Sequence, residues 1–400
     1  MQTARLWYKN DTGEDINMVT RIKSKRIITP EGFVSGYVYF DKDQILGVNL
    51  QEQPWEREYD FGNQMVSPGF VDIHVHGGNG FDFCRDDAEG DAAAINLHLA
   101  HGTTTIVPTL CSVDFAAIDR SLGNIQECIR RGLNKANICG VHLEGPYFSP
   151  KQSGAQNPDH LVGIDREQYT TLIKKYGNLI KRWSYAPELD TDCAFTKYLA
   201  ENNIVAAMGH TDAIYDECMA AFAEGCRLVT HLYSCTSTIT RKGGFRRLGV
   251  IETAYLQDDM DVEIIADGRH LPPELIRLIC KIKGYDRVTL VTDAMSAAGS
   301  DAKEAEIGGM PCIIEDGVAK LPDRSAFAGS IATADRLLRV CVQEAGIPLL
   351  SALKMLTSNP ARIMGINAGE IRTGARPDFV VLSDTLQVMD VFVGGKAVEL

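Results

Sequence analysis

The chain has 400 residues, of which 45% are hydrophobic and 23% are charged. These proportions are ordinary for a globular chain, so they exclude a disordered or fibrous protein. Acidic residues outnumber basic ones by 53 to 40, which gives a formal net charge of −13. This excess of negative charge argues against nucleic acid or an anionic membrane as the main partner, and an anionic substrate would need local cations.

Neither a membrane anchor nor a disulfide framework is visible in the sequence. No apolar run approaches the roughly 18–20 residues that cross a bilayer, and residues 1–15 lack the apolar segment of a secretory signal. The 11 cysteines are odd in number and have no CxxC spacing, which is typical of reduced thiols. We therefore expect a soluble, cytoplasmic protein that binds neither membranes nor nucleic acid.

The two ends of the chain predict one small β domain. Short β segments, bounded by glycine, aspartate and proline, lie at 26–28, 33–40, 45–48, 378–382 and 388–393. We assign residues 1–66 and 369–400 to this domain. The residue pattern of residues 1–17 differs from that of the chain that follows. We interpret this segment as an extension or a start-site artefact without a structural role.

Residues 67–368 alternate short apolar runs with helical patterns, as buried parallel strands covered by helices do. The predicted strands are residues 69–76, 103–110, 136–144, 180–186, 204–210, 228–234, 262–267 and 288–293. The predicted helices are residues 116–131, 166–175, 193–202, 213–224, 273–282, 331–344 and 348–356, with a β excursion over 307–321. Eight such repeats predict an α/β fold, a (β/α)₈ TIM barrel, for this domain.

Histidines and carboxylates gather at the predicted strand ends, where the catalytic groups of such a barrel lie. The residues at these ends are His74, His76, His142, Glu144, His210, His231 and Asp293. His74 and His76 are two residues apart on one strand, so their side chains point to the same face. A lone His-x-His pair also occurs in hydrogen-bonded cores, but five of the nine histidines at strand ends favour a metal site. Such ligands suit Zn²⁺, Fe²⁺ and Mn²⁺ alike.

Six segments around these residues carry a more specific pattern. They read Pro68-Gly-Phe-Val-Asp-Ile-His-Val-His-Gly, Val141-His-Leu-Glu-Gly-Pro-Tyr, Gly209-His-Thr-Asp-Ala, Thr230-His-Leu-Tyr, Ile265-Ala-Asp-Gly-Arg-His and Leu290-Val-Thr-Asp-Ala. From about residue 20 to the C-terminus the chain resembles the amidohydrolase superfamily and, within it, the N-acetylglucosamine-6-phosphate deacetylase family. The His-Leu-Glu-Gly-Pro and Ala-Asp-Gly-x-His segments are the most specific to that family.

The resemblance implies a metal centre. Glu144, His210 and His231 would bind the principal ion, and His74 and His76 would complete a second position. One or two divalent ions, zinc, iron or manganese, are therefore expected in each subunit. A homodimer is the assembly that the family leads us to expect.

The resemblance also implies roles around the metal. Asp293 would be the general base, and His270 would orient the substrate and polarise its carbonyl. From its position alone, His142 shares a strand face with Glu144 but lies deeper, so we expect it to support the ligands from behind. The residues implied to line the sugar phosphate pocket are Ala155, Gln156, Ser234, Cys235, Phe327, Ala328 and Gly329.

The segment after the sixth strand departs from the family pattern. Ser234 replaces an asparagine there, and Gln156 stands where many members have histidine. Four cations follow within seven residues: Arg241, Lys242, Arg246 and Arg247. A guanidinium fork suits phosphate, so we favour Arg241 as the phosphate ligand. Arg246 or Arg247 reaching across a dimer interface, or a solvated basic loop, are the alternatives.

The implied activity is the metal-dependent hydrolysis of the acetamide of N-acetylglucosamine-6-phosphate to glucosamine-6-phosphate and acetate. The expected partner is thus a small amino sugar phosphate. The alternatives are an N-acetylgalactosamine-6-phosphate deacetylase, another amidohydrolase acting on a different N-acyl substrate, or an inactive barrel that senses sugar phosphates. Because an intact Asp293 is needed only for turnover, its presence favours an enzyme.

Overall fold

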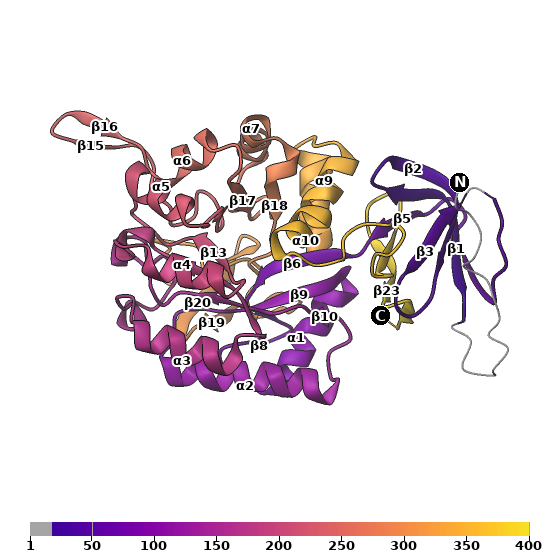
Figure 1. Cartoon of the computed structure of the whole chain (residues 1–400), viewed down its shortest axis with the longest axis horizontal. Coiled ribbons are helices and arrows are strands. Elements are labelled where there is room, and N and C mark those ends of the chain that lie inside the picture. The colour runs from indigo at the N-terminus through magenta and orange to yellow at the C-terminus, as the bar shows by residue number, and fades with distance from the viewer. Residues whose placement is uncertain (1–17, 50, 400) are drawn as a thin grey trace.

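Both ends of the described chain meet in one sheet beside the barrel (Figure 1). The structure, a computed structural model, describes residues 18–49 and 51–399, so the predicted extension over 1–17 lies outside the described residues. The sheet runs in the order β24-β23-β22-β5-β1-β2-β3, with β4 paired to β1. Its strands are β1 (Thr20–Thr29), β2 (Gly32–Phe40), β3 (Ile45–Asn49), β4 (Arg57–Asp60), β5 (Met65–Pro68), β22 (Phe379–Leu382), β23 (Val388–Val393) and β24 (Lys396–Val398). The prediction that both termini build one β unit is confirmed.

Buried aromatic side chains hold the two ends of the chain together in this sheet. Phe379 of β22 and Phe392 of β23 pack with Phe40 of β2, and the ring centroids of Phe40 and Phe379 are 5.0 Å apart. Burying one phenylalanine stabilises a fold by roughly 1.5–3 kcal/mol. These contacts therefore attach the C-terminal strands to the N-terminal ones.

Eight parallel strands form the barrel, and each lies where an apolar run predicts one. They are β6 (Phe70–Val75), β9 (Thr103–Leu110), β11 (Val141–Glu144), β12 (Ile180–Tyr185), β13 (Val205–Met208), β14 (Leu228–Val229), β17 (Asp261–Ile264) and β18 (Val288–Leu290). Neighbours pair in parallel from β6 round to β18. Backbone hydrogen bonds from Asp293 N to His74 O (2.9 Å) and from His76 N to Ala294 O (2.8 Å) link the first and last strands. The predicted (β/α)₈ fold is confirmed.

Several strands end earlier than their apolar runs. His210, His231 and Asp293 follow β13, β14 and β18 with φ angles of 46°, 28° and 48°, outside the extended region. A residue in the left-handed region cannot continue a strand, so the chain turns at these points into the loops around the barrel mouth. The predicted strand over 136–144 is also divided, into β10 (Asn137–Ile138) and β11.

Helices cover the outside of the barrel (Figure 1). Those near predicted positions are α2 (Phe115–Arg131), α3 (Arg166–Tyr176), α4 (Ala194–Glu201), α5 (Tyr215–Ala223), α7 (Pro273–Lys283), α8 (Ala334–Arg339) and α9 (Leu349–Leu356). The prediction omitted α1 (Ala88–Ala100), α6 (Val250–Leu256) and α10 (Ser358–Met364). In α1, small and polar residues such as Gly90, Asp91 and Ala94 are buried together with Ile95, so its sequence lacks the apolar stripe of an amphipathic helix.

Three antiparallel excursions leave the barrel, of which the shortest pairs β7 (Gly77–Gly78) with β8 (Phe81–Asp82). The strands β19 (Glu304–Ile307), β20 (Met310–Glu315) and β21 (Val318–Lys320) form the β excursion predicted after the eighth strand. The hairpin of β15 (Thr240–Lys242) and β16 (Phe245–Arg247) projects from the body at the top left of Figure 1. Among the described residues, no helix combines the length and apolarity needed to span a membrane.

Removing one ring of the aromatic cluster should destabilise the terminal sheet. Phe379 is fully buried, so Phe379→Ala is expected to lower the free energy of unfolding by about 3–5 kcal/mol through lost burial and a residual cavity. Met389→Ala, at a half-exposed position on the neighbouring strand, should cost less than about 1 kcal/mol. Urea unfolding of the two variants measures both values, and equal losses would contradict the role given to the aromatic cluster.

Candidate functional site

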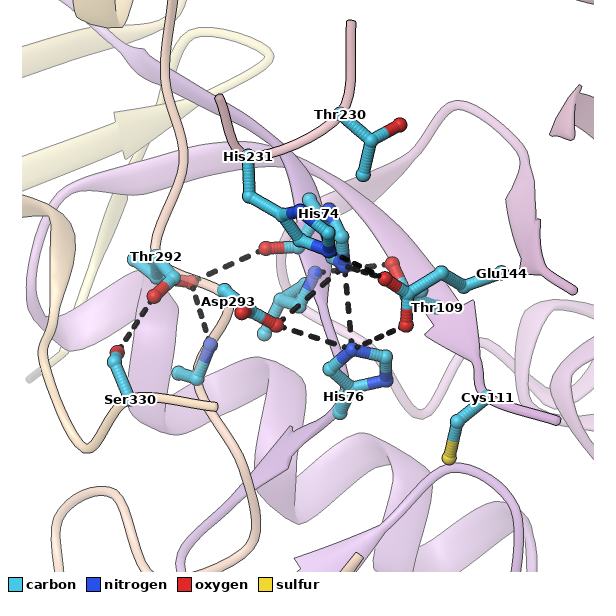
Figure 2. A network of polar contacts seen from close by, with 12 residues as sticks. His74, His76, Thr109, Cys111, Glu144, Thr230, His231, Thr292, Asp293 and Ser330 are labelled. Atoms are coloured by element: carbon cyan, nitrogen blue, oxygen red, sulfur yellow. Dashed lines mark hydrogen bonds and ion pairs between the residues drawn. The ribbon is translucent and has the colours of Figure 1, made fainter. Parts of the chain in front are cut away.

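Six side chains proposed to bind metal or act as a base converge at the mouth of the barrel, and Figure 2 shows five of them. They are His74, His76, Glu144, His210, His231 and Asp293, all of them buried. Three of the six stand in the left-handed backbone conformation described above. A non-glycine residue held there costs of order 1–3 kcal/mol, and such strain is concentrated at functional sites. The turns aim these three side chains into the barrel mouth.

Glu144 lies at the centre of the group. Its Oε1 atom is 2.8 Å from His231 Nε2, 3.2 Å from His210 Nε2 and 3.5 Å from His74 Nε2. Its Oε2 atom is 3.3 Å from His76 Nε2. The second carboxylate, Asp293, places Oδ1 at 3.1 Å from His76 Nε2 and 3.4 Å from His74 Nε2.

The far nitrogens of two imidazoles are already bonded to carbonyl groups. His210 Nδ1 donates to Gln152 O at 2.8 Å, and His231 Nδ1 donates to Ser234 O at 3.1 Å. Each of these rings therefore has an acceptor at both nitrogens, because Nε2 faces Glu144. Burial lowers the pKa of His231, and a neutral imidazole has only one N–H, so a cation between its Nε2 and the carboxylate would satisfy this contact. The donor set fits a divalent metal ion.

The pKa shifts of the carboxylates and of His231 also favour a cation at this site. Burial opposes ionisation of Asp293, but the imidazoles of His74 and His76 outweigh it and lower its pKa to about 2. Burial likewise opposes ionisation of Glu144, and the surrounding imidazoles hold its pKa well below the usual range. Burial lowers the pKa of His231 and is only partly offset by Glu144, so this ring is neutral at pH 7. Two ionised carboxylates thus face one buried space beside a neutral ligand.

Two triads within the group have ligand atoms close enough to share one ion each. His74, His76 and Asp293 form the first, and His74, Glu144 and His231 form the second, with all ligand atoms of a triad within 4.8 Å of one another. The second triad contains Glu144 and His231 but not His210, and His74 belongs to both triads, so these groups match the two positions expected from the sequence only in part.

A cavity of about 270 Å³ opens directly above these converging side chains. Of the residues predicted to contact substrate, those that line it are Ala155, Gln156, Ser234, Cys235, His270, Phe327 and Gly329. Lining residues that the prediction omitted are Cys111, Tyr233, Ile307 and Ala326. A hollow of about 720 Å³ against β19 and β20 is larger, but it contains none of the six converging side chains.

Two of the predicted substrate residues do not line the cavity. Ala328 is fully buried beside it, and its backbone N–H donates to Ala319 O at 3.0 Å. Arg241 lies on the exposed hairpin of β15 and β16, which projects away from the barrel (Figure 1). Within one chain, the structure therefore does not bring Arg241 to the site.

Gln156 and His270 are both held by neighbouring groups. Gln156 Nε2 donates to Glu144 Oε2 at 2.7 Å, while its Oε1 accepts from Ser112 N at 2.7 Å, so this side chain clamps a predicted ligand. His270 Nδ1 lies 2.9 Å from Asp267 Oδ2, which leaves Nε2 available to the cavity. Both arrangements limit the rotation of groups at the cavity wall.

His142 is excluded from the converging group. Its two nitrogens contact Ser184 Oγ at 2.7 Å and Thr109 Oγ1 at 3.2 Å, below the predicted ligands. Burial and the charge of Arg182 hold its pKa well below the usual range, so the ring is neutral. It packs edge-on against His74 with ring centroids 4.7 Å apart, as a supporting residue would.

Arg182 and Glu263 are charged residues that the prediction missed. Both are completely buried and form a salt bridge beneath the ligands. A signal was present, because both charges lie within runs that are otherwise largely apolar, Arg182 beside Lys181 and Glu263 between Val262 and Ile264. The prediction considered only the ends of the runs and so passed over them.

Known proteins of one family match nearly the whole chain. The profile of the amidohydrolase family matches residues 65–398. The chain is 30% identical to N-acetylglucosamine-6-phosphate deacetylase of Bacillus subtilis, covering 92% of this chain and 94% of that protein. It is 27% identical to N-acetylgalactosamine-6-phosphate deacetylase of Escherichia coli O157:H7, covering 94% and 98%.

A solved structure agrees with this match. The crystal structure of N-acetyl-D-glucosamine-6-phosphate deacetylase from Mycobacterium smegmatis superposes with a TM-score of 0.87 at 32% identity, over 96% of this chain and 100% of that one. A variant of that protein has been solved in complex with N-acetyl-D-glucosamine-6-phosphate. The chain belongs to the amidohydrolase family and, within it, to the group that contains the N-acetylglucosamine-6-phosphate deacetylases.

The metal-free protein should lose stability as the pH rises. Burial opposes protonation of His74, but Glu144 and Asp293 outweigh it and raise the pKa from 6.5 to about 8. The resulting stabilisation is fully present below pH 6.5 and is lost as the pH rises through 8; it amounts to about 2 kcal/mol. In urea unfolding, the stability gap between the wild type and His74→Gln should narrow by that amount from pH 6 to pH 9. A gap independent of pH would contradict this assignment.

Proposed function

We propose that this chain hydrolyses the acetamide of N-acetylglucosamine-6-phosphate to glucosamine-6-phosphate and acetate. The observation that carries the proposal is the convergence of four imidazoles and two ionised carboxylates at the floor of a cavity of about 270 Å³. Relatives with this named activity match nearly the whole chain. We place the reaction in the cytoplasm, because all 11 cysteines are free thiols.

We infer that Glu144, His210 and His231 hold the principal metal ion, and that His74 and His76 with Asp293 form a second position. Zinc, iron and manganese all suit this ligand set, in one or two copies. When bound, such an ion polarises an amide carbonyl and lowers the pKa of bound water from 15.7 to about 7. The protein holds the ligand side chains in fixed orientations and shields the site from bulk water.

Asp293 is positioned to act as the general base. Its carboxylate is ionised at neutral pH and lies at the cavity wall, so it can accept the proton of the attacking water. The water oxygen then bonds to the acetyl carbon. As the carbon–nitrogen bond breaks, the same carboxyl group returns the proton to the leaving nitrogen, which departs as the free amine.

Other residues would orient the substrate. His270, with Nδ1 held by Asp267, can direct Nε2 to the acetyl carbonyl. Phe327 packs edge-on against His270, with ring centroids 4.9 Å apart, and lines the same wall. Gly329 adopts a φ of 69°, and a Cβ atom there would lie 2.9 Å from Asp293 O. Only glycine therefore lets the 327–329 loop approach the general base this closely.

The phosphate group requires cations that the cavity of one chain does not offer. No lysine or arginine is found among the described residues that line it. The hairpin of β15 and β16 carries Arg241, Lys242, Arg246 and Arg247, and its strand residues are exposed. We infer a homodimer in which this hairpin reaches the partner's cavity, with one or more of its three arginines gripping the phosphate.

Replacing the general base should separate chemistry from metal binding. Asp293→Asn is expected to lower kcat by about 10²–10⁴-fold, because the amide cannot accept the proton. The principal ion, which we assign to Glu144, His210 and His231, should remain. Steady-state kinetics together with metal analysis of the purified variant test this.

The matched control for this variant is Asp335→Asn, which removes a similarly buried carboxylate outside the cavity. Its kcat should stay close to that of the wild type. An Asp293→Asn protein that turns over at the wild-type rate would refute the role of Asp293 as the base.

The substrate is tested by acetate release from four compounds measured side by side. These are N-acetylglucosamine and N-acetylgalactosamine, each with and without a 6-phosphate. We expect rapid release only from phosphorylated sugars, with the gluco form preferred. Preference for the galacto form would favour the activity named for the Escherichia coli relative, and no release from any of the four by metal-loaded protein would refute the proposal.

A further inference from the structure

A salt bridge lies in the barrel interior directly beneath the metal ligands. Arg182 extends from β12 and Glu263 from β17, and both side chains are completely buried. The guanidinium contacts both carboxylate oxygens: NH1 donates to Oε1, and NH2 donates to Oε2 at 2.9 Å. The same guanidinium donates to Ile73 O and Thr230 Oγ1, each at 3.0 Å. The pair thus links four barrel strands or their ends.

One oxygen of this salt bridge contacts two residues of the metal group. Glu263 Oε2 lies 3.5 Å from His74 Nδ1 and 3.4 Å from the backbone nitrogen of His231. The other ring nitrogen of His74, Nε2, lies 3.2 Å from His76 Nε2 and 3.4 Å from Asp293 Oδ1. His74 therefore stands between Glu263 and the metal position formed with His76 and Asp293.

Stability alone does not account for a buried pair of this kind. Removing two charges from water costs several kcal/mol per ion, and apolar residues of similar volume often serve a core equally well. A carboxylate at Nδ1, however, makes that nitrogen the protonated one and leaves the lone pair on Nε2. Arg182 occupies both oxygens of Glu263 and so holds the carboxylate in the orientation that faces His74.

We propose that Glu263, held by Arg182, is a positioning residue that sets the tautomer and ring orientation of His74 and so allows the His74, His76 and Asp293 position to bind its metal ion. The inference rests on the metal-dependent function proposed above. Glu263 itself touches no substrate and does not line the cavity. It acts on the reaction through the ring of His74, whereas its contact with His231 is to the backbone nitrogen and not to the imidazole.

The test is a metal titration of the stripped protein against a chromophoric chelator. The wild type should bind two Zn²⁺ ions. Glu263→Gln introduces a side chain of the same size that does not require an N–H at Nδ1 of His74. In this variant, the Zn²⁺ affinity of one position should fall by about 10–100-fold. The other position should stay within a few-fold of the wild type. Co²⁺ loading should give the same result, with loss of the absorption contributed by one of the two ions.

Further variants separate positioning from folding. Asp261→Asn breaks a second salt bridge on β17, where Arg362 donates to both oxygens of Asp261 at 2.9 and 2.7 Å. It should lower the melting temperature of the metal-free protein and leave both metal affinities unchanged. Glu263→Asp keeps the carboxylate and should recover part of the lost affinity. If Glu263→Gln does not fold, Arg182→Met/Glu263→Leu removes both charges while filling the core, and it should show the same selective loss.

The outcomes distinguish this inference from the proposed function. A wild type that binds two ions and releases acetate, beside a Glu263→Gln protein with both affinities unchanged or both reduced equally, would overturn the positioning role alone. A wild type that binds one ion and is active would overturn it as well, because the His74 position would then be unused. A wild type that neither binds metal nor releases acetate would overturn the proposed function.

Discussion

The buried charge of Glu144 is the constraint on which the rest of the site depends. A carboxylate removed from water is unfavourable unless cations or hydrogen-bond donors surround it. An imidazole on β6 and others that follow β13 and β14 approach its oxygens, and the amide of Gln156 donates to Oε2. A parallel barrel makes this possible, because all of its strands deliver their C-terminal ends to the same mouth. Residues far apart in the chain thus meet without long loops.

Local backbone strain accompanies this convergence. His210, His231 and Asp293 all leave their strands in the left-handed conformation, which non-glycine residues seldom adopt. These strained turns persist only because contacts with the surrounding barrel stabilise them. The buried Arg182–Glu263 pair is part of that support, since it contacts the backbone nitrogen of His231 and the ring of His74 from below.

The sequence predicts the barrel and the side chains that converge at its mouth, because both follow simple rules. Apolar runs mark buried strands, and a histidine or carboxylate at the end of a run marks the barrel mouth. Contacts between side chains from separate strands follow no such local rule. The clamp of Gln156 on Glu144 and the Arg182–Glu263 bridge could be found only once the strands were placed in register. Helix α1 was missed for a related reason, because it is buried on several sides and has no amphipathic stripe.

Arg241 illustrates a further limit of sequence reasoning. Its residue type and neighbours suit phosphate, yet the structure puts it on a projecting hairpin rather than in the cavity of its own chain. A local sequence describes the chemistry of a loop but not where that loop reaches. The proposed homodimer would bring the cations of the hairpin to a cavity that is lined by no lysine or arginine among the described residues.

The central claim is that Glu144, His210 and His231 hold a divalent metal ion at the mouth of the barrel. Anomalous X-ray diffraction from crystals of the metal-loaded protein, recorded at the absorption edge of the ion, tests it most directly. The account predicts an anomalous peak within bonding distance of Glu144 and both imidazoles. A loaded, active protein whose anomalous peaks lie elsewhere, or that gives none, would contradict it.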